Sequence, residues 1–352
     1  MKKTLLTICL VWMCFSLSAQ KIIDLSGKWS FSIDRQDNGE KEKWFSHTLN
    51  DFINLPGSMP EKLKGDEVTA KTQWTGSLYD SSYYYNPYME KYRKEGNIKF
   101  PFFLTPDKHY VGAAWYQKEV NIPADWKGER ILLFLERPHI ETTVWVNGQK
   151  TGMQNSLCVP HQYDITRYVR PGKCTITIRV DNRIKEINVG PDSHSITDQT
   201  QGNWNGIVGR ICLQTTPKTY FDDIQIYPEP EQKLARVKVV IKGTGTAKVK
   251  LSAESFNTDK KHIVPAIQQE IKLNKGVTET EMVLPMGNDM LLWDEFHPAL
   301  YKLKAEVTNG KKTEIKEIQF GMRRFEIKGK WFYVNGRKTQ LRGTVENLSL
   351  IH

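Results

Sequence analysis

Alternation of apolar and polar residues recurs in short segments along nearly the whole chain, and it constrains the fold more than any other feature. Thr142–Val146 alternates directly into Asn147-Gly148, and Thr175–Val180 alternates without interruption. A period of two places alternate side chains on opposite faces of a strand, and Asn-Gly is a strong hairpin-turn signal. Helical periodicity is weak throughout. The sequence therefore predicts an all-β fold built from packed sheets.

The residues from Lys21 to about Pro217 predict one β-rich domain, a sandwich or jelly roll. Its expected strands are Leu25–Phe31, Trp115–Val120, Ile131–Leu135, Thr142–Val146, Thr175–Val180 and Ile207–Leu213. The third of these is continuously apolar, which is typical of a strand buried on both faces. A polar and aromatic section from Asp34 to Gly112 is expected to form loops with brief ordered pieces.

A second sandwich is expected after a linker at Pro228-Glu229-Pro230. Segments with the same alternation follow this linker: Leu234–Ile241, Ala247–Ala253, Thr278–Leu284, Leu300–Val307 and Thr313–Phe320. The region is close in length to an immunoglobulin-like sandwich of roughly 100 residues. No Cys-Trp-Cys pattern marks it, so the prediction depends on the number and length of the strands.

The N-terminus has the pattern of an export signal. Met1-Lys2-Lys3 is positively charged, Leu5–Leu17 is apolar, and cleavage is expected after Ala19. The apolar run is shorter than the ~20 residues that a membrane-spanning helix needs. The mature chain is therefore expected to be periplasmic or extracellular, with no membrane span.

Charge and cysteine content limit the classes of partner. The net charge is +10, but Lys and Arg alternate with apolar residues, as in Lys233–Lys238, which is typical of the solvated face of a strand. Nucleic acid is therefore not expected as a partner. Cys158, Cys174 and Cys212 remain after the leader, so at most one disulfide can form. Cys158 and His161 have metal-ligand spacing without a second pair, so a buried structural cysteine is expected there rather than zinc.

The stretch Phe320–Gly343 contains another hairpin signal. Phe332–Val334 alternates into Asn335-Gly336, and Thr339–Leu341 is expected to be a short strand that ends in Arg342-Gly343.

Together with this stretch, motifs along the chain follow the order found in glycoside hydrolase family 2. The motifs are Ala114–Lys118, Val144–Gly148, Asp164–Thr166, Ile178–Asn182, Asn203–Arg210, Trp293, Pro298–Tyr301 and Phe320–Arg323. The chain resembles this family over nearly all of its mature length. After the leader at 1–19, the resemblance implies a sugar-binding jelly roll at 20–219 and an immunoglobulin-like sandwich at 220–321. Residues 322–352 would be an incomplete start of a (β/α)₈ catalytic barrel, which needs about 250 residues.

The resemblance implies the N-terminal portion of a secreted, β-galactosidase-like exo-glycosidase that acts on oligosaccharides or polysaccharide fragments. Retaining hydrolysis of an O-glycosidic bond needs two carboxyl groups about 5 Å apart. In the family both belong to glutamates on later barrel strands, which lie beyond His352. Glu346-Asn347 has the reverse of the family's Asn-Glu order, so no catalytic residue is assigned. This chain alone is expected to be inactive and to require no cofactor.

The resemblance also implies substrate contacts outside the barrel. Asp198 would contact sugar hydroxyls and a sodium ion, and Asn97 would hydrogen-bond the substrate. Trp204 would stack on a sugar, and Arg342 would lie at the base of the active site. The residues alone leave two alternatives open: an Asx-turn at Asp198 and an aromatic packed on the sandwich at Trp204.

Two further expectations come from the residues themselves. His161 and His194 are expected to be solvated or capping loop residues, because no nucleophile accompanies them. A stand-alone carbohydrate-binding module without chemistry is the alternative to the glycosidase interpretation. Phe332, Tyr333 and Leu341 argue against that module, because they would then be exposed apolar residues with nothing to pack against.

Overall fold

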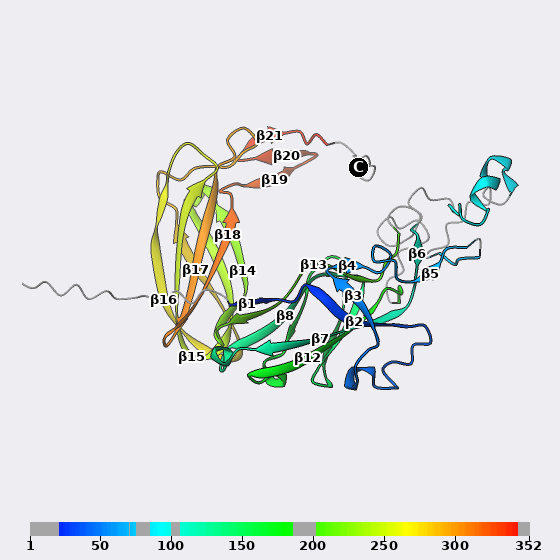
Figure 1. The fold of residues 1–352 in the computed structure, drawn as a ribbon. Helices are drawn as coiled ribbons and strands as arrows, with labels where there is room; N and C mark the ends of the chain where they lie inside the picture. The colour runs from blue at the N-terminus through cyan, green and yellow to red at the C-terminus, as the bar shows by residue number, and fades with distance from the viewer. Residues whose placement is uncertain (1–20, 70, 75–84, 100–105, 186–201, 344–352) are drawn as a thin grey trace, which may run out of the picture. The chain divides into compact units, whose positions relative to one another are not determined.

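The computed structural model describes residues 21–69, 71–74, 85–99, 106–185 and 202–343. Antiparallel strands and short 3₁₀ turns make up nearly all the regular structure of these residues (Figure 1). None of their helices is long and apolar enough to cross a membrane. Contacts divide the described chain into one unit that ends at Thr216 and another that begins at Pro217. The predicted all-β class is confirmed.

The first unit is a sandwich of two antiparallel sheets. One sheet has the order β1-β13-β8-β11, with β4 beside β13, and the other has the order β10-β9-β12-β7-β2-β3. Strands β5 and β6 form a separate small sheet. The strands are β1 Ile22–Asp24, β2 Gly27–Asp34, β3 Asp51–Leu55, β4 Gly57–Ser58, β5 Asp66–Glu67, β6 Lys108–His109, β7 Ala113–Ile122, β8 Arg130–Pro138, β9 Glu141–Val146, β10 Gln149–Asn155, β11 His161–Asp164, β12 Gly172–Asp181 and β13 Gly206–Thr216. The 3₁₀ turns are η1 Trp44–Ser46, η2 Pro87–Tyr92, η3 Ala124–Trp126 and η4 Thr166–Tyr168.

Side chains from both sheets meet in one hydrophobic core. Phe31 and Tyr116 contribute from one sheet and Leu133 and Leu213 from the other, all of them fully buried. The predicted alternation is clear in β2, where Trp29 and Phe31 face the core. The continuously apolar run in β8 is buried on both faces, as its sequence indicates.

The second face of the six-stranded sheet is also covered. Trp115 and Trp145 lie on that face with ring centroids 5.0 Å apart. Phe45 stacks on Trp145 at 5.1 Å, and Trp44 packs against Trp115 at 6.1 Å. The segment around η1 therefore shields the outer face, which is why Trp115 and its neighbour Tyr116 are both buried instead of alternating.

The second unit is a sandwich of long strands. Its sheet has the order β14-β15-β17-β18, with β16 also paired to β15. The strands are β14 Tyr220–Glu229, β15 Leu234–Phe256, β16 Ile263–Pro285, β17 Leu300–Asn309 and β18 Lys312–Phe320. The segments expected at Leu234–Ile241 and Ala247–Ala253 are the two halves of β15. A register shift between Gly243 and Gly245 separates the halves, as a β-bulge does where a strand bends.

The linker predicted at Pro228–Pro230 is wrong. Pro228 and Glu229 end strand β14, which the sequence interpretation missed, and Pro230 opens the 3₁₀ turn η5 Pro230–Gln232. Lys233 then adopts φ of 55°, and the chain returns along β14 as β15. The proline pair therefore belongs to a tight turn within one sheet.

The C-terminal described residues form a three-stranded antiparallel sheet of β19 Phe325–Lys328, β20 Trp331–Val334 and β21 Arg337–Thr339. The hairpin expected at Asn335-Gly336 joins β20 to β21. The strand expected at Thr339–Leu341 is wrong in its bounds, because pairing with β20 begins at Arg337 and ends at Thr339.

We predict that Leu133→Ala lowers the free energy of unfolding of the first unit by about 2–5 kcal/mol, because it leaves a cavity between the two sheets. Urea unfolding followed by tryptophan fluorescence measures this loss. Leu63→Ala is the control, since Leu63 is 62% exposed and its loss should change stability by less than about 0.5 kcal/mol. Equal effects of the two substitutions would contradict the placement of the core.

Candidate functional site

Three buried asparagines, which we call the amide frame, join the ends of strands in the first unit: Asn182, Asn203 and Asn205. Asn205 donates from Nδ2 to the carbonyl oxygens of Gly112 and Val180, each at 2.9 Å. Its Oδ1 accepts a hydrogen bond of 2.7 Å from the Tyr116 hydroxyl. Both ends of this buried side chain are therefore satisfied, as burial of an amide requires.

Asn182 and Asn203 extend the frame. Asn182 accepts from the Gly112 N–H at 2.8 Å and donates to the Tyr110 carbonyl at 2.8 Å. Asn203 donates from Nδ2 to the Asn182 carbonyl at 3.0 Å. Gly112 has φ of +150°, and a Cβ there would lie 2.6 Å from the Tyr110 hydroxyl oxygen. The position therefore requires glycine.

The frame holds the chain on both sides of residues 186–201. Asp198, the predicted contact for sugar hydroxyls and sodium, lies outside the described residues, as does His194. The Asn203–Asn182 hydrogen bond joins described residues that precede and follow residues 186–201 in the sequence. The roles of Asp198 remain predictions.

Charged groups surround the same strand end. The carboxylate of Asp181, which is fully buried, lies 3.0 Å from Arg179, 2.5 Å from Arg183 and 2.9 Å from Lys185. Asp37 bonds both arginines at 2.6 Å. Burial alone would raise the pKa of Asp181, but hydrogen bonds from Arg183 and Lys185 outweigh it and hold the pKa well below its usual range.

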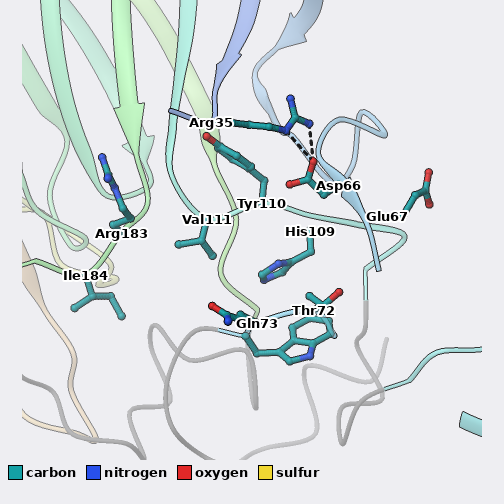
Figure 2. A pocket seen from close by; sticks show the side chains of 11 residues that line it. Arg35, Asp66, Glu67, Thr72, Gln73, His109, Tyr110, Val111, Arg183 and Ile184 are labelled. Atoms are coloured by element: carbon teal, nitrogen blue, oxygen red, sulfur yellow. Dashed lines mark hydrogen bonds and ion pairs between the residues drawn. The ribbon is translucent and has the colours of Figure 1, made fainter. Parts of the chain in front are cut away.

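A cavity of about 780 Å³ lies beside this charged cluster, within the 300–1,000 Å³ typical of ligand pockets (Figure 2). The described residues that line it are Arg35, Asp66, Glu67, Thr72, Gln73, Trp74, His109, Tyr110, Val111, Arg183 and Ile184. The small β5–β6 sheet builds one wall, because Asp66 is the register partner of His109.

The cavity combines aromatic rings with paired charges. Arg35 donates to one Asp66 oxygen from Nε at 3.0 Å and from Nη2 at 2.6 Å, as the dashed lines of Figure 2 show. The rings of Trp74 and His109 lie 4.7 Å apart. The Tyr110 hydroxyl donates to the Ala113 carbonyl, which fixes its ring. Such a wall can offer an apolar surface together with hydrogen-bond donors and acceptors.

The other predicted site residues do not line this cavity. Asn97 is exposed after η2, and its side chain donates to the Lys91 carbonyl at 2.8 Å. Trp204 is half-buried, and its ring stacks on His139 with centroids 4.5 Å apart. This packing matches the alternative in which Trp204 covers the sandwich, and it occupies one face of the ring.

Arg342 is exposed and lies in the second unit, where it lines another cavity of about 660 Å³. The residues lining that cavity are Trp293, Glu295, Phe296, Arg323, Phe325, Val334, Arg337, Lys338, Thr339, Gln340, Leu341 and Arg342. The guanidinium of Arg323 lies over the Trp293 ring at 4.6 Å, and that of Arg337 lies over Phe296 at 5.0 Å. The surface is thus both aromatic and basic.

Two expectations about single residues are wrong. His161 is not solvated but fully buried in β11, where its ring bonds Thr142 Oγ1 at 2.6 Å and the Ser156 carbonyl at 3.1 Å. Cys158 is exposed rather than buried, and Cys174 and Cys212 are buried. All three thiols are free in the structure. Among the described residues no group of three or more His, Cys, Asp or Glu could hold a metal ion.

Sequence reasoning missed the cavity residues of the first unit. Only Arg183 carried a signal, because it directly follows the Asp181-Asn182 motif. Arg35, Asp66 and Trp74 lie in the polar section that was expected to form loops. Their roles depend on contacts between distant segments, which local periodicity does not report.

Comparison with known protein families identifies both units. Residues 22–217 match the model described as glycosyl hydrolases family 2, sugar binding domain. The chain belongs to this family. Residues 219–323 match a second model, described as glycosyl hydrolases family 2. The resemblance stated from the motifs is therefore confirmed, and it extends through both units.

Similar proteins are glycosidases of greater length. A β-glucuronidase of Paenibacillus borealis is 24% identical over 344 residues, which cover 92% of this chain and 49% of that protein. The β-galactosidase large subunit of Latilactobacillus sakei is 24% identical over 328 residues, covering 91% and 49%. A solved β-glucuronidase of an uncultured Clostridium has a TM-score of 0.61 at 22% identity, covering 91% and 48%. The chain thus spans about half the length of these relatives.

We predict that Asp181→Asn destabilises the protein most near neutral pH. The folded pKa of Asp181 lies below the unfolded value of about 3.9, so its ionised form stabilises the fold above about pH 4. That contribution is lost as the pH falls from there toward the folded pKa. Urea unfolding of both proteins from pH 7 to pH 2.5 should show their difference shrinking below about pH 4. A difference that stays constant over this range would contradict the electrostatic role.

Proposed function

We propose that this chain is the N-terminal, sugar-binding portion of an exported family 2 exo-glycosidase with β-galactosidase-like specificity. The order of the two family matches supports this proposal, as do the relatives named β-glucuronidase and β-galactosidase. The complete enzyme would hydrolyse O-glycosidic bonds with retention. Its two carboxyl groups would come from the half of the relatives that this chain does not match.

The observation that carries the proposal is the amide frame. Its hydrogen bonds fix the chain on both sides of the segment that bears Asp198. A loop that must place a carboxylate against a sugar gains precision from a rigid scaffold. We therefore assign to the sandwich the task of positioning Asp198, whose carboxylate would accept hydrogen bonds from sugar hydroxyls and coordinate a sodium ion.

Exposed apolar side chains favour the glycosidase over a stand-alone binding module. Phe325 is 50% exposed, Ile327 69%, Trp331 41% and Leu341 61%. Phe325, Ile327 and Trp331 lie on β19 and β20, and Leu341 follows β21. Phe332 and Tyr333, which were expected to be exposed, are half-buried. A group of exposed apolar side chains on and beside one small sheet indicates a surface that another part of a protein covers. In the proposed enzyme the catalytic barrel would pack there.

We predict that residues 20–352 alone do not hydrolyse p-nitrophenyl β-galactoside or p-nitrophenyl β-glucuronide above the buffer rate. The reason is that no pair of carboxyls in this polypeptide is assigned to acid/base and nucleophile. Release of p-nitrophenol after repurification is the measurement. Turnover that changes on Glu346→Gln would overturn the proposal that catalysis needs the additional half.

In an enzyme assembled with a family 2 barrel, we predict that Asp198→Ala lowers kcat/KM by at least about tenfold and changes Tm little, because it removes a positioning contact. Asp24→Ala is the matched control. Asp24 accepts a hydrogen bond of 3.0 Å from the Ser26 N–H, so its loss should cost about 1 kcal/mol of stability and leave the kinetics unchanged. A lower Tm with unchanged kcat/KM for Asp198→Ala would identify it as a structural Asx-turn.

A further inference from the structure

The cavity of the first unit holds two arginines and two carboxylates among its described lining residues: Arg35, Arg183, Asp66 and Glu67. Arg35 is paired with Asp66, and Arg183 is paired with Asp37 and Asp181. Glu67 is paired with Lys108. The charged groups that line the cavity therefore already have partners of opposite sign.

A cavity wall whose charged side chains are already paired with each other suits a neutral polar ligand better than an anion. A carboxylated ligand would have to compete with Asp66 or Asp37 for a guanidinium, and desolvation of its own charge would oppose binding. Hydroxyl groups need no such exchange, because they both donate and accept. Asp66 is about half exposed and uses one oxygen for Arg35, so its other oxygen can accept from a hydroxyl.

Aromatic residues supply the apolar contacts that a sugar ring needs in addition to hydrogen bonds. Trp74 and Tyr110 line the same cavity, and Trp74 is only partly buried. One face of a pyranose ring is made of C–H groups, and such a face packs on an aromatic side chain while the hydroxyls point outward. An apolar surface with a few convergent polar groups is the ordinary composition of a small-molecule site.

We propose that this cavity binds a neutral sugar unit, with the ring on Trp74 and the hydroxyls on the Arg35–Asp66 pair. The proposal rests on the proposed function, because it takes carbohydrate as the ligand of this sandwich. It gives the β-galactosidase-like specificity of that function a binding site in the first unit, one that favours a neutral glycoside such as a β-galactoside over a uronide. All the described residues that line the cavity belong to the first unit.

The binding test uses residues 20–352 labelled with 5-fluorotryptophan and titrated with methyl β-D-galactoside. The ¹⁹F signal of residue 74 is identified by its absence in Trp74→Phe. Its chemical shift should change as the galactoside is added and reach a plateau when the site is saturated. Trp74→Ala should weaken the affinity measured by calorimetry at least about fivefold, the loss expected for an aromatic contact. Tyr88→Ala is the matched control, since Tyr88 is 85% exposed and lies outside the cavity.

The charge test compares methyl β-D-galactoside with methyl β-D-glucuronide. The wild type should bind the galactoside at least about threefold more tightly. Asp66→Asn frees the charge of Arg35, so it should shift the preference toward the glucuronide. Circular dichroism checks the fold of each variant, and Trp74→Phe replaces Trp74→Ala if the latter does not fold.

Three results would overturn the proposal: no binding of either glycoside, binding that is unchanged in the Trp74 variants, or a wild-type preference for the glucuronide. Failure of the proposed function can be distinguished from failure of this inference. An active assembled enzyme whose sandwich does not bind galactoside at Trp74 would remove only this inference. An inactive assembly with Trp74-dependent binding would instead leave the sugar site and remove the glycosidase.

Discussion

The need to satisfy buried amide groups organises the sugar-binding sandwich. Asn205 lies completely buried between two strands, and each of its polar atoms finds a partner on a different segment. Leaving a buried polar group without its hydrogen bond costs about 1–3 kcal/mol. Moving one of these segments away from Asn205 would therefore be unfavourable. Gly112 allows the close approach, because a side chain there would meet Tyr110. These contacts hold the start of β7, the end of β12 and the residues before β13 together.

Much of the fold could be predicted from the sequence, because alternation and Asn-Gly turns are local. Strands β9 and β12 and the turn between β9 and β10 follow their patterns closely. Asn147 and Asn335 both adopt the positive φ that this turn needs. The sequence did not predict the turn at Pro230, because Lys233 adopts a positive φ and is neither glycine nor asparagine, the residues that usually mark such a turn. A proline pair then gives the appearance of a linker.

Long-range packing explains the remaining differences. Trp115 is buried on the outer face of its sheet because a segment from another part of the chain, with Trp44, Phe45 and Leu49, folds over that face. The same is true of the candidate site, where Asp66 and His109 become neighbours through the pairing of β5 with β6. Periodicity describes one segment at a time, so it can indicate a strand but cannot reveal what covers it.

Pairing of the charges also prepares the cavity for a ligand. Arg35 is held by two hydrogen bonds to Asp66, and Arg183 is held by Asp37 and Asp181. Ordering a long charged side chain when a ligand binds opposes association, typically by about 0.5–1.5 kcal/mol for each side chain. Here much of that ordering occurs when the sandwich folds. The ion pairs therefore reduce the attraction for anions and, at the same time, present fixed donors and acceptors to a neutral sugar.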